Sequence, residues 1–163
     1  MKNITRNTLI ITLALILVCF SVASCSGGSE KCFSGEGFSV TLDSSFVEKS
    51  GGGAVGYYES KSAVVTVHTE SFASLQGYRV ETPTDYAKRV IAANGLDGAE
   101  ITEKNGLVFF EYQKTVNNKE CKYLAALYRG SRGFWLVQFG SLANEYESIR
   151  ESFLKYAKSF SAD

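Results

Sequence analysis

The chain has 163 residues, of which 45% are hydrophobic, and its 17 basic residues are balanced by 17 acidic ones. This length predicts a single domain that can bury a core of its own. The balanced charge offers no electrostatic case for nucleic-acid binding, so no nucleic-acid partner is expected.

The first 24 residues have the pattern of a secretory leader. Lys2 and Arg6 precede a mostly apolar run over residues 9–23, and small residues follow it. The run is about 15 residues long, whereas a membrane-spanning helix needs about 20. An ordinary secretory peptide and an uncut membrane anchor are the alternatives to the interpretation given next.

The end of this leader, Val22-Ala23-Ser24-Cys25, resembles the bacterial prolipoprotein signal. The resemblance implies cleavage between Ser24 and Cys25 and a lipid attached to the Cys25 sulfur. It also implies palmitate-type acylation and an anchor on the extracytoplasmic face of a bacterial cell membrane. Two acyl chains hold a protein far more firmly than one.

The leader divides the chain into three predicted parts. Residues 1–24 are the signal peptide, residues 25–32 are the lipidated N-terminus and a flexible tether, and residues 33–163 form the single domain. Cleavage removes both Lys2 and Arg6, so the mature protein is slightly acidic.

Two arrangements are open for the remaining cysteines, Cys32 and Cys121. A disulfide between them would close a loop of about 88 residues in a compartment that permits such bonds. Alternatively, Cys121 is a buried strand residue and Cys32 is an incidental residue near the tether.

The first half of the domain is predicted to contain three strands and a helix. Alternating apolar and polar residues place the strands at 38–42, 54–60 and 63–68. A longer irregular connection over 71–81 leads to the helix. Thr82 is its predicted N-cap, Pro83 suits its first position, and Asn94-Gly95 ends it.

The second half reads as a meander of strands and a final helix. The strands are predicted at 99–103, 107–116, 120–129 and 134–141. In the final helix Asn144 is the predicted N-cap, and Glu147 completes a capping box. The helix then carries an apolar stripe that a sheet must cover, formed by Ile149, Phe153, Tyr156 and Phe160.

Several of these strands carry apolar residues on both alternating faces, so both faces of the sheet are expected to be covered. The predicted fold class is therefore α+β, with an antiparallel β-sheet meander flanked by helices in an α-β-α sandwich. The element order, the early GFSVTLDSSF segment and the late GFWLVQFGS strand resemble the PsbP-like fold, as found in small bacterial lipoproteins. The resemblance implies a non-catalytic binding or assembly role and carries over no functional residue.

The sequence contains one histidine, His68, which excludes a multi-histidine zinc site. Its neighbours on the same strand face, Thr66 and Glu70, form no recognisable nucleophile motif. We therefore predict no catalytic residue, no metal, no cofactor and no enzymatic activity.

Aromatic residues are the better candidates for a ligand or partner surface, because they combine a large apolar body with a polar tip. The candidates are Tyr57, Tyr58, Tyr78, Tyr112, Tyr128 and Trp135. The alternative is that strand aromatics serve the core. The loops at 51–56 and 71–78 are the places where a rigid sheet would present a site.

The predicted function is that of a lipid-anchored extracytoplasmic binding or assembly module without enzymatic activity. Its partners are the membrane, through the lipid, and an envelope protein or a small ligand. An envelope-associated hydrolase with an unrecognised site and a structural envelope component are the alternatives.

Overall fold

The computed structural model describes residues 29–51 and 53–163. The predicted signal peptide, its cleavage site and Cys25 lie outside the described residues. No helix in the described part of the chain is both long and apolar enough to cross a bilayer.

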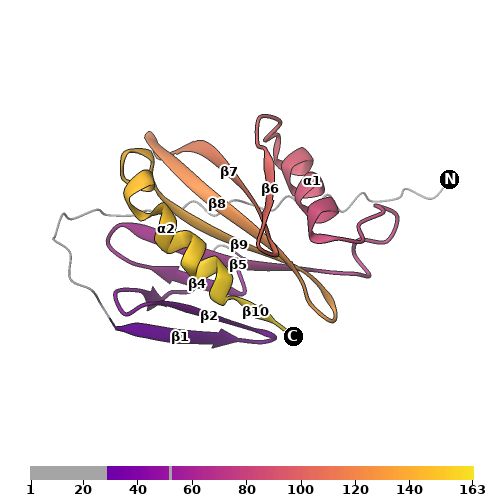
Figure 1. The fold of residues 1–163 in the computed structure, drawn as a ribbon, viewed down its shortest axis with the longest axis horizontal. Helices are drawn as coiled ribbons and strands as arrows, with labels where there is room; N and C mark the ends of the chain where they lie inside the picture. The colour runs from indigo at the N-terminus through magenta and orange to yellow at the C-terminus, as the bar shows by residue number, and fades with distance from the viewer. Residues whose placement is uncertain (1–28, 52) are drawn as a thin grey trace.

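The main sheet has seven antiparallel strands in the order β3-β4-β5-β9-β8-β7-β6 (Figure 1). The strands are β3 (Val47–Glu48), β4 (Gly56–Glu59), β5 (Ala63–Ser71), β6 (Ile101–Lys104), β7 (Leu107–Val116), β8 (Lys119–Arg129) and β9 (Gly133–Leu142). The central strand, β9, is buried over all but its last residue. This burial on both faces explains why its sequence, GFWLVQFGSL, lacks a clear polar alternation.

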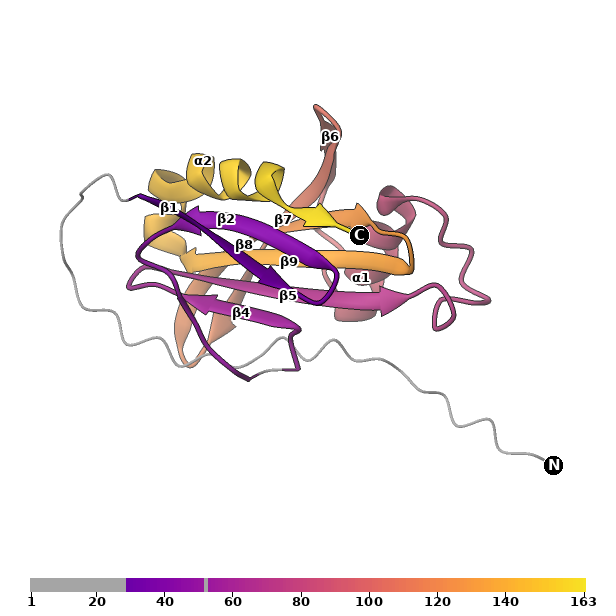
Figure 2. The same ribbon diagram turned by 90° about the horizontal axis from the view of Figure 1, so that it is seen from below.

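A second, smaller sheet lies with helix α2 (Ala143–Ser159) on one face of the main sheet, and helix α1 (Pro83–Asn94) covers part of the other face (Figures 1 and 2). The small sheet has the order β1-β2-β10. Its strands are β1 (Glu30–Gly35), β2 (Phe38–Asp43) and β10 (Ser161–Ala162). The predicted fold class is confirmed, with the small sheet as an addition that was not predicted.

The core between the main sheet and α2 is dominated by aromatic side chains. Phe139 of β9 is fully buried, and its ring centroid lies 5.7 Å from that of Phe153 of α2. Phe160 closes the end of this core with its ring centroid 4.5 Å from that of Tyr128. Fully burying a side chain of this size stabilises a fold by about 1.5–3 kcal/mol.

The core between the main sheet and α1 is smaller. Tyr86 of α1 stacks on Phe134 of β9 with ring centroids 5.1 Å apart. Phe72 and Leu75, from the connection between β5 and α1, cover the same end of the sheet. A short helix and an irregular segment therefore cover this face, where a long helix and a sheet cover the other.

The start and end of α1 are as predicted. The Thr82 hydroxyl accepts a hydrogen bond from the Asp85 amide at 3.1 Å, and the Asp85 carboxylate accepts one from the Thr82 amide at 3.1 Å. Gly95 ends the helix with φ 64°, in the left-handed region that glycine adopts readily.

The predicted start of α2 is wrong. β9 ends at Leu142 and α2 begins at Ala143, so Asn144 is already inside the helix and the N-cap residue, Leu142, makes no side-chain cap. Glu147 forms an ion pair with Lys122 of β8 at 2.7 Å in place of the predicted capping box. The strand continues directly into the helix, and this leaves no connecting residue to serve as a polar cap.

Three short strands were not predicted. β1 begins at Glu30, three residues before the expected start of the domain at Phe33, so the last residues assigned to the tether belong to the fold. β3 and β10 have two residues each. Such strands are specified by their partners across the sheet and leave little periodic signal in the sequence.

Candidate functional site

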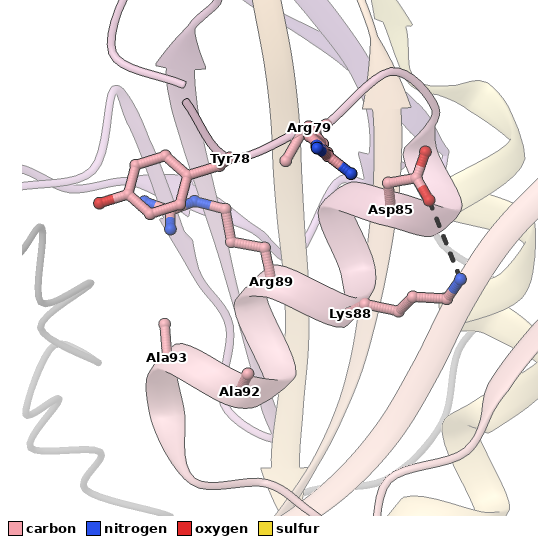
Figure 3. Close-up of a pocket in the computed structure, with 8 residues that line it drawn as sticks. Tyr78, Arg79, Asp85, Lys88, Arg89, Ala92 and Ala93 are labelled. Carbon is pink, nitrogen blue, oxygen red and sulfur yellow. Dashed lines mark ion pairs between the residues drawn. The ribbon is translucent and has the colours of Figure 1, made fainter. Parts of the chain in front are cut away.

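An open pocket of about 550 Å³ lies on the outer side of α1, against the segment that leads into the helix (Figure 3). The helix buries Tyr86, Ala87 and Val90 toward the sheet. Its opposite side therefore carries the pocket residues at helical spacing. The lining residues are Tyr78, Arg79, Val80, Asp85, Lys88, Arg89, Ala92 and Ala93.

Arg89 is held from two directions. Its Nη2 atom donates to Oε1 of Glu70 at 3.1 Å, and the Glu70 side chain, at the end of β5, is only 5% exposed. The guanidinium also lies over the ring of Tyr78, 3.8 Å from the ring centroid. These contacts fix the plane of the guanidinium and hold Tyr78 at the pocket's edge.

Asp85 is the carboxylate within the pocket lining, and its oxygens are already engaged. The Thr82 hydroxyl donates to Asp85 Oδ2 at 2.7 Å, and Lys88 Nζ lies 3.8 Å from Asp85 Oδ1. The hydrogen bond from the Thr82 side chain lowers the pKa of Asp85, so the group stays ionised at neutral pH. The negative charge of Asp85 stabilises the N-terminus of α1.

Arg79 has a different position. Its backbone lies in the left-handed region with φ 50°, which is uncommon for a residue other than glycine. Among the described residues, no hydrogen bond or ion pair holds its exposed side chain. The pocket therefore contains one exposed guanidinium to which the described residues supply no partner, beside two engaged cations, Lys88 and Arg89.

Two of the six predicted aromatic candidates are accessible. Tyr78 is 54% exposed and lines the pocket. Tyr57 is half-buried on β4, and burial, with a further contribution from Glu59, raises its pKa to about 12. The connection over 71–78, which was expected to present a site, therefore contributes to the pocket.

The other four candidates pack in the core instead, because each side chain points toward a covered face of the sheet. Tyr58 is 1% exposed and packs on Phe33, and Trp135 is 7% exposed beside Phe38. The Tyr128 hydroxyl donates to the Ala157 carbonyl at 2.6 Å, which ties β8 to α2.

Tyr112, the fourth of these, belongs to a polar row within the main sheet. Gln138 Nε2 donates to the Tyr112 hydroxyl at 2.8 Å, and the Thr66 hydroxyl donates to Gln138 Oε1 at 3.2 Å. Tyr123 stacks on Tyr112 with ring centroids 5.0 Å apart. Burial raises the pKa of Tyr112 well above its usual value. These buried polar groups satisfy one another, as a stable core requires.

His68 lies on β5 between Thr66 and Glu70, and burial lowers its pKa. Thr66 is engaged with Gln138 and Glu70 with Arg89. Among residues 29–51 and 53–163, no side chain forms a hydrogen bond or an ion pair with His68. The same residues contain no cluster of histidine, cysteine or acidic side chains that could hold a metal ion.

Cys32 and Cys121 are both free thiols. Cys32 is exposed on β1 and pairs with Thr41 in the small sheet, whereas Cys121 lies on β8 and pairs with Leu142 in the main sheet. Strand alternation places Cys121 on the same side as Tyr123, away from the small sheet. Neither of the two predicted arrangements is matched in full, because the thiols are not bridged, Cys121 is half-buried rather than buried, and Cys32 lies in a strand rather than in the tether.

Sequence reasoning missed Arg79, Lys88 and Arg89. The spacing of Asp85, Lys88, Arg89 and Ala92 marks one face of the helix and was available as a signal. The approach of Tyr78 and Arg79 to that face was not, because it depends on how an irregular segment packs.

No protein-family model matches the chain, and no curated protein matches it. Its structure is similar to that of CyanoP, the cyanobacterial PsbP of Synechocystis sp. PCC 6803, with a TM-score of 0.56 and 14% identity over 87% of this chain and 99% of that one. A crystal structure from Bacteroides thetaiotaomicron VPI-5482 gives a TM-score of 0.53 and 10% identity over 85% of this chain and 49% of that one, so this chain spans about half of it.

LpqN of Mycobacterium tuberculosis, described as involved in cell envelope biogenesis, gives a TM-score of 0.42 and 8% identity over 83% of this chain and 85% of that one. The described domain has a PsbP-like fold, as the sequence texture predicted. The fold places the pocket on the side of the main sheet that α1 covers.

Proposed function

We propose that the protein is a lipid-anchored, extracytoplasmic binding module without enzymatic activity, and that the pocket on α1 contacts its ligand. The observation that carries this proposal is the placement of the two ends of the domain. β1 begins at Glu30 toward one end of the molecule, and α1, whose outer side carries the pocket, lies toward the other end (Figures 1 and 2). An anchor at Cys25 would therefore leave the pocket facing away from the membrane.

The chemistry of the pocket supports binding rather than catalysis. Its lining contains three cations, the phenol of Tyr78 and one carboxylate, and that carboxylate accepts the hydrogen bond that caps α1. General acid–base catalysis requires a group that exchanges protons within reach of a reacting atom. The lining contains no histidine, and its single carboxylate is already engaged at the start of the helix.

The anchor is tested by acylation in cells. We expect the wild-type protein to incorporate labelled palmitate and to fractionate with membranes, and Cys25→Ala to do neither. Cys32→Ala is the matched control, because that thiol is exposed and close in sequence but outside the signal. Palmitate in the Cys25→Ala protein, or its loss from Cys32→Ala, would overturn the anchoring.

The role of the pocket is tested by photo-crosslinking in intact cells. A benzophenone amino acid replaces Tyr78 in one variant and Lys61, an exposed residue of the turn between β4 and β5, in the other. We expect an adduct, detected as added mass on the purified protein, from position 78 and none from position 61. Equal adducts at both positions, or none at position 78, would overturn the assignment of the pocket.

A further inference from the structure

We infer that the pocket on α1 binds an oxyanion, the phosphate or carboxylate group of a soluble ligand, with Arg79 as its principal contact. This inference rests on the proposed function, since it names the ligand chemistry of the same pocket. Arg79, Lys88 and Arg89 all line the cavity, and Figure 3 shows them around the same stretch of α1.

The pocket lining is rich in hydrogen-bond donors. A guanidinium carries five N–H donors and no acceptor. Glu70 takes a bond from one nitrogen of Arg89, and among the described residues no hydrogen bond or ion pair engages the side chain of Arg79. The pocket therefore has several more donors than acceptors, which is the condition for binding an anionic group.

Two carboxylates, Glu70 and Asp85, form ion pairs with the cations of the pocket. Glu70 is buried behind Arg89 and balances that residue alone. Asp85 accepts from the amide and the hydroxyl of Thr82 and stands 3.8 Å from Lys88. Both carboxylates are committed within the fold, so neither compensates Arg79. The amide of Asp85 is also capped by Thr82, so the charge of the site comes from side chains rather than from the helix start.

The cavity has room for more than an oxyanion. Its volume of about 550 Å³ exceeds that of a bare phosphate, and the small side chains of Ala92 and Ala93 line it without filling the space. One face of the Tyr78 ring lies on Arg89, and the residue is 54% exposed. An apolar or ring-shaped part of the ligand can therefore pack on Tyr78 while the oxyanion contacts Arg79. The ligand class that fits is an organic phosphate or carboxylate.

A membrane phosphate group is the other source of the same chemistry. The start of β1 at Glu30 and helix α1 lie toward opposite ends of the molecule (Figure 2), and the pocket is on the outer side of α1. Lipid headgroups of the anchoring membrane would lie near the tether end of the domain, away from the pocket. The position of the pocket therefore favours a soluble oxyanion.

The test uses the mature, lipidated protein in nanodiscs of phosphatidylcholine, with arginine side-chain Nε signals followed by NMR. Inorganic phosphate and succinate are titrated at constant ionic strength against chloride. We expect saturable shifts of the Arg79 and Arg89 signals with at least one of the two oxyanions and none with chloride. Non-saturable shifts that match those in chloride would overturn the inference.

Variants make the test specific. Arg79→Gln removes a side chain that has no hydrogen-bond or ion-pair partner among the described residues, so the fold is expected to persist, and the affinity should fall by roughly tenfold or more. Arg132→Gln, the same change at another exposed arginine in the turn between β8 and β9, should change the affinity less than about twofold. Equal losses in both variants would show general charge attraction and would overturn the inference.

A final arm separates the two sources of oxyanion. Nanodiscs that contain phosphatidylglycerol, without added phosphate, should leave the Arg79 signal unchanged. A shift there would overturn the assignment to a soluble ligand. Oxyanion binding is read from the arginine signals and anchoring from palmitate incorporation, so the two fail separately: a protein that binds phosphate in solution but carries no lipid on Cys25 would overturn only the proposed anchoring.

Discussion

The two faces of the main sheet are covered in different ways. On one face, α2 and the small sheet enclose a continuous aromatic core around Phe139 and Phe153. On the other face, α1 and the connection after β5 cover a smaller core around Phe134, and the pocket opens on the outside of that helix. We therefore expect more of the stability to come from the α2 face, whereas the accessible charged groups of the pocket lie on the thinner α1 layer.

The largest expected effect comes from two substitutions on the same strand. Phe139→Ala empties space between β9 and α2 and should lower the free energy of unfolding by about 3–5 kcal/mol. Phe134→Ala, on the opposite face, should cost less, because Phe72 is only partly buried and can move into the cavity. Urea unfolding measures both. An equal or larger loss for Phe134→Ala would contradict the difference between the faces.

An intermediate effect is expected at the helix starts. Thr82→Ala removes the side-chain cap of α1 and should lower stability by about 1 kcal/mol. Asn144→Ala should change stability by less than about 0.5 kcal/mol, because Asn144 lies within α2 and caps nothing. Thermal unfolding of the two variants checks this. A loss at Asn144 comparable to that at Thr82 would show that it acts as a cap after all.

The smallest expected effect is a pH dependence on the α2 side. Burial opposes the ionisation of Asp43, but hydrogen bonds from Ser45 and from the Tyr156 hydroxyl, at 2.7 Å, outweigh it and lower its pKa. The folded pKa therefore lies below the unfolded one. The resulting stabilisation is present at neutral pH and is lost as the pH falls below about 4.

Removing the Tyr156 hydroxyl should reduce this dependence. In urea unfolding at a series of pH values, Tyr156→Phe should be less stable than wild type at neutral pH, and the difference should shrink in acid. Asp97→Asn, at an exposed carboxylate in the connection after α1, is the control and should leave the acid profile unchanged. A difference that stays constant with pH would contradict the role assigned to the Asp43–Tyr156 bond.

The sequence predicted best those features that depend on neighbouring residues. The capping box at Thr82 and the glycine at 95 set the limits of α1, and both act within a few residues of the chain. The long strands β7, β8 and β9 are periodic or apolar enough to be recognised within about a residue of their bounds. The prediction for the start of α2 was wrong because the residues around Asn144 have the same local pattern as a true helix cap.

The candidate site was harder to predict than the fold. Tyr58, Trp135 and Tyr78 are similar residue types, and their different exposure follows from which sheet face is covered at each position. Neither that coverage nor the approach of Arg79 to α1 leaves a local signal. The connection over 71–78 was predicted as a binding region, but the cations of the pocket were not.

The outermost strand of the small sheet has a mechanical consequence. Phe33 is the only buried residue of β1, and an ion pair between Glu30 and Lys155 fastens its first residue to α2. β2 stays attached without β1, since it also pairs with β10 and exchanges hydrogen bonds with Ser159. If the anchor pulled on the domain, β1 would separate from β2 first and lengthen the tether by about 20 Å, while the rest of the domain stayed folded.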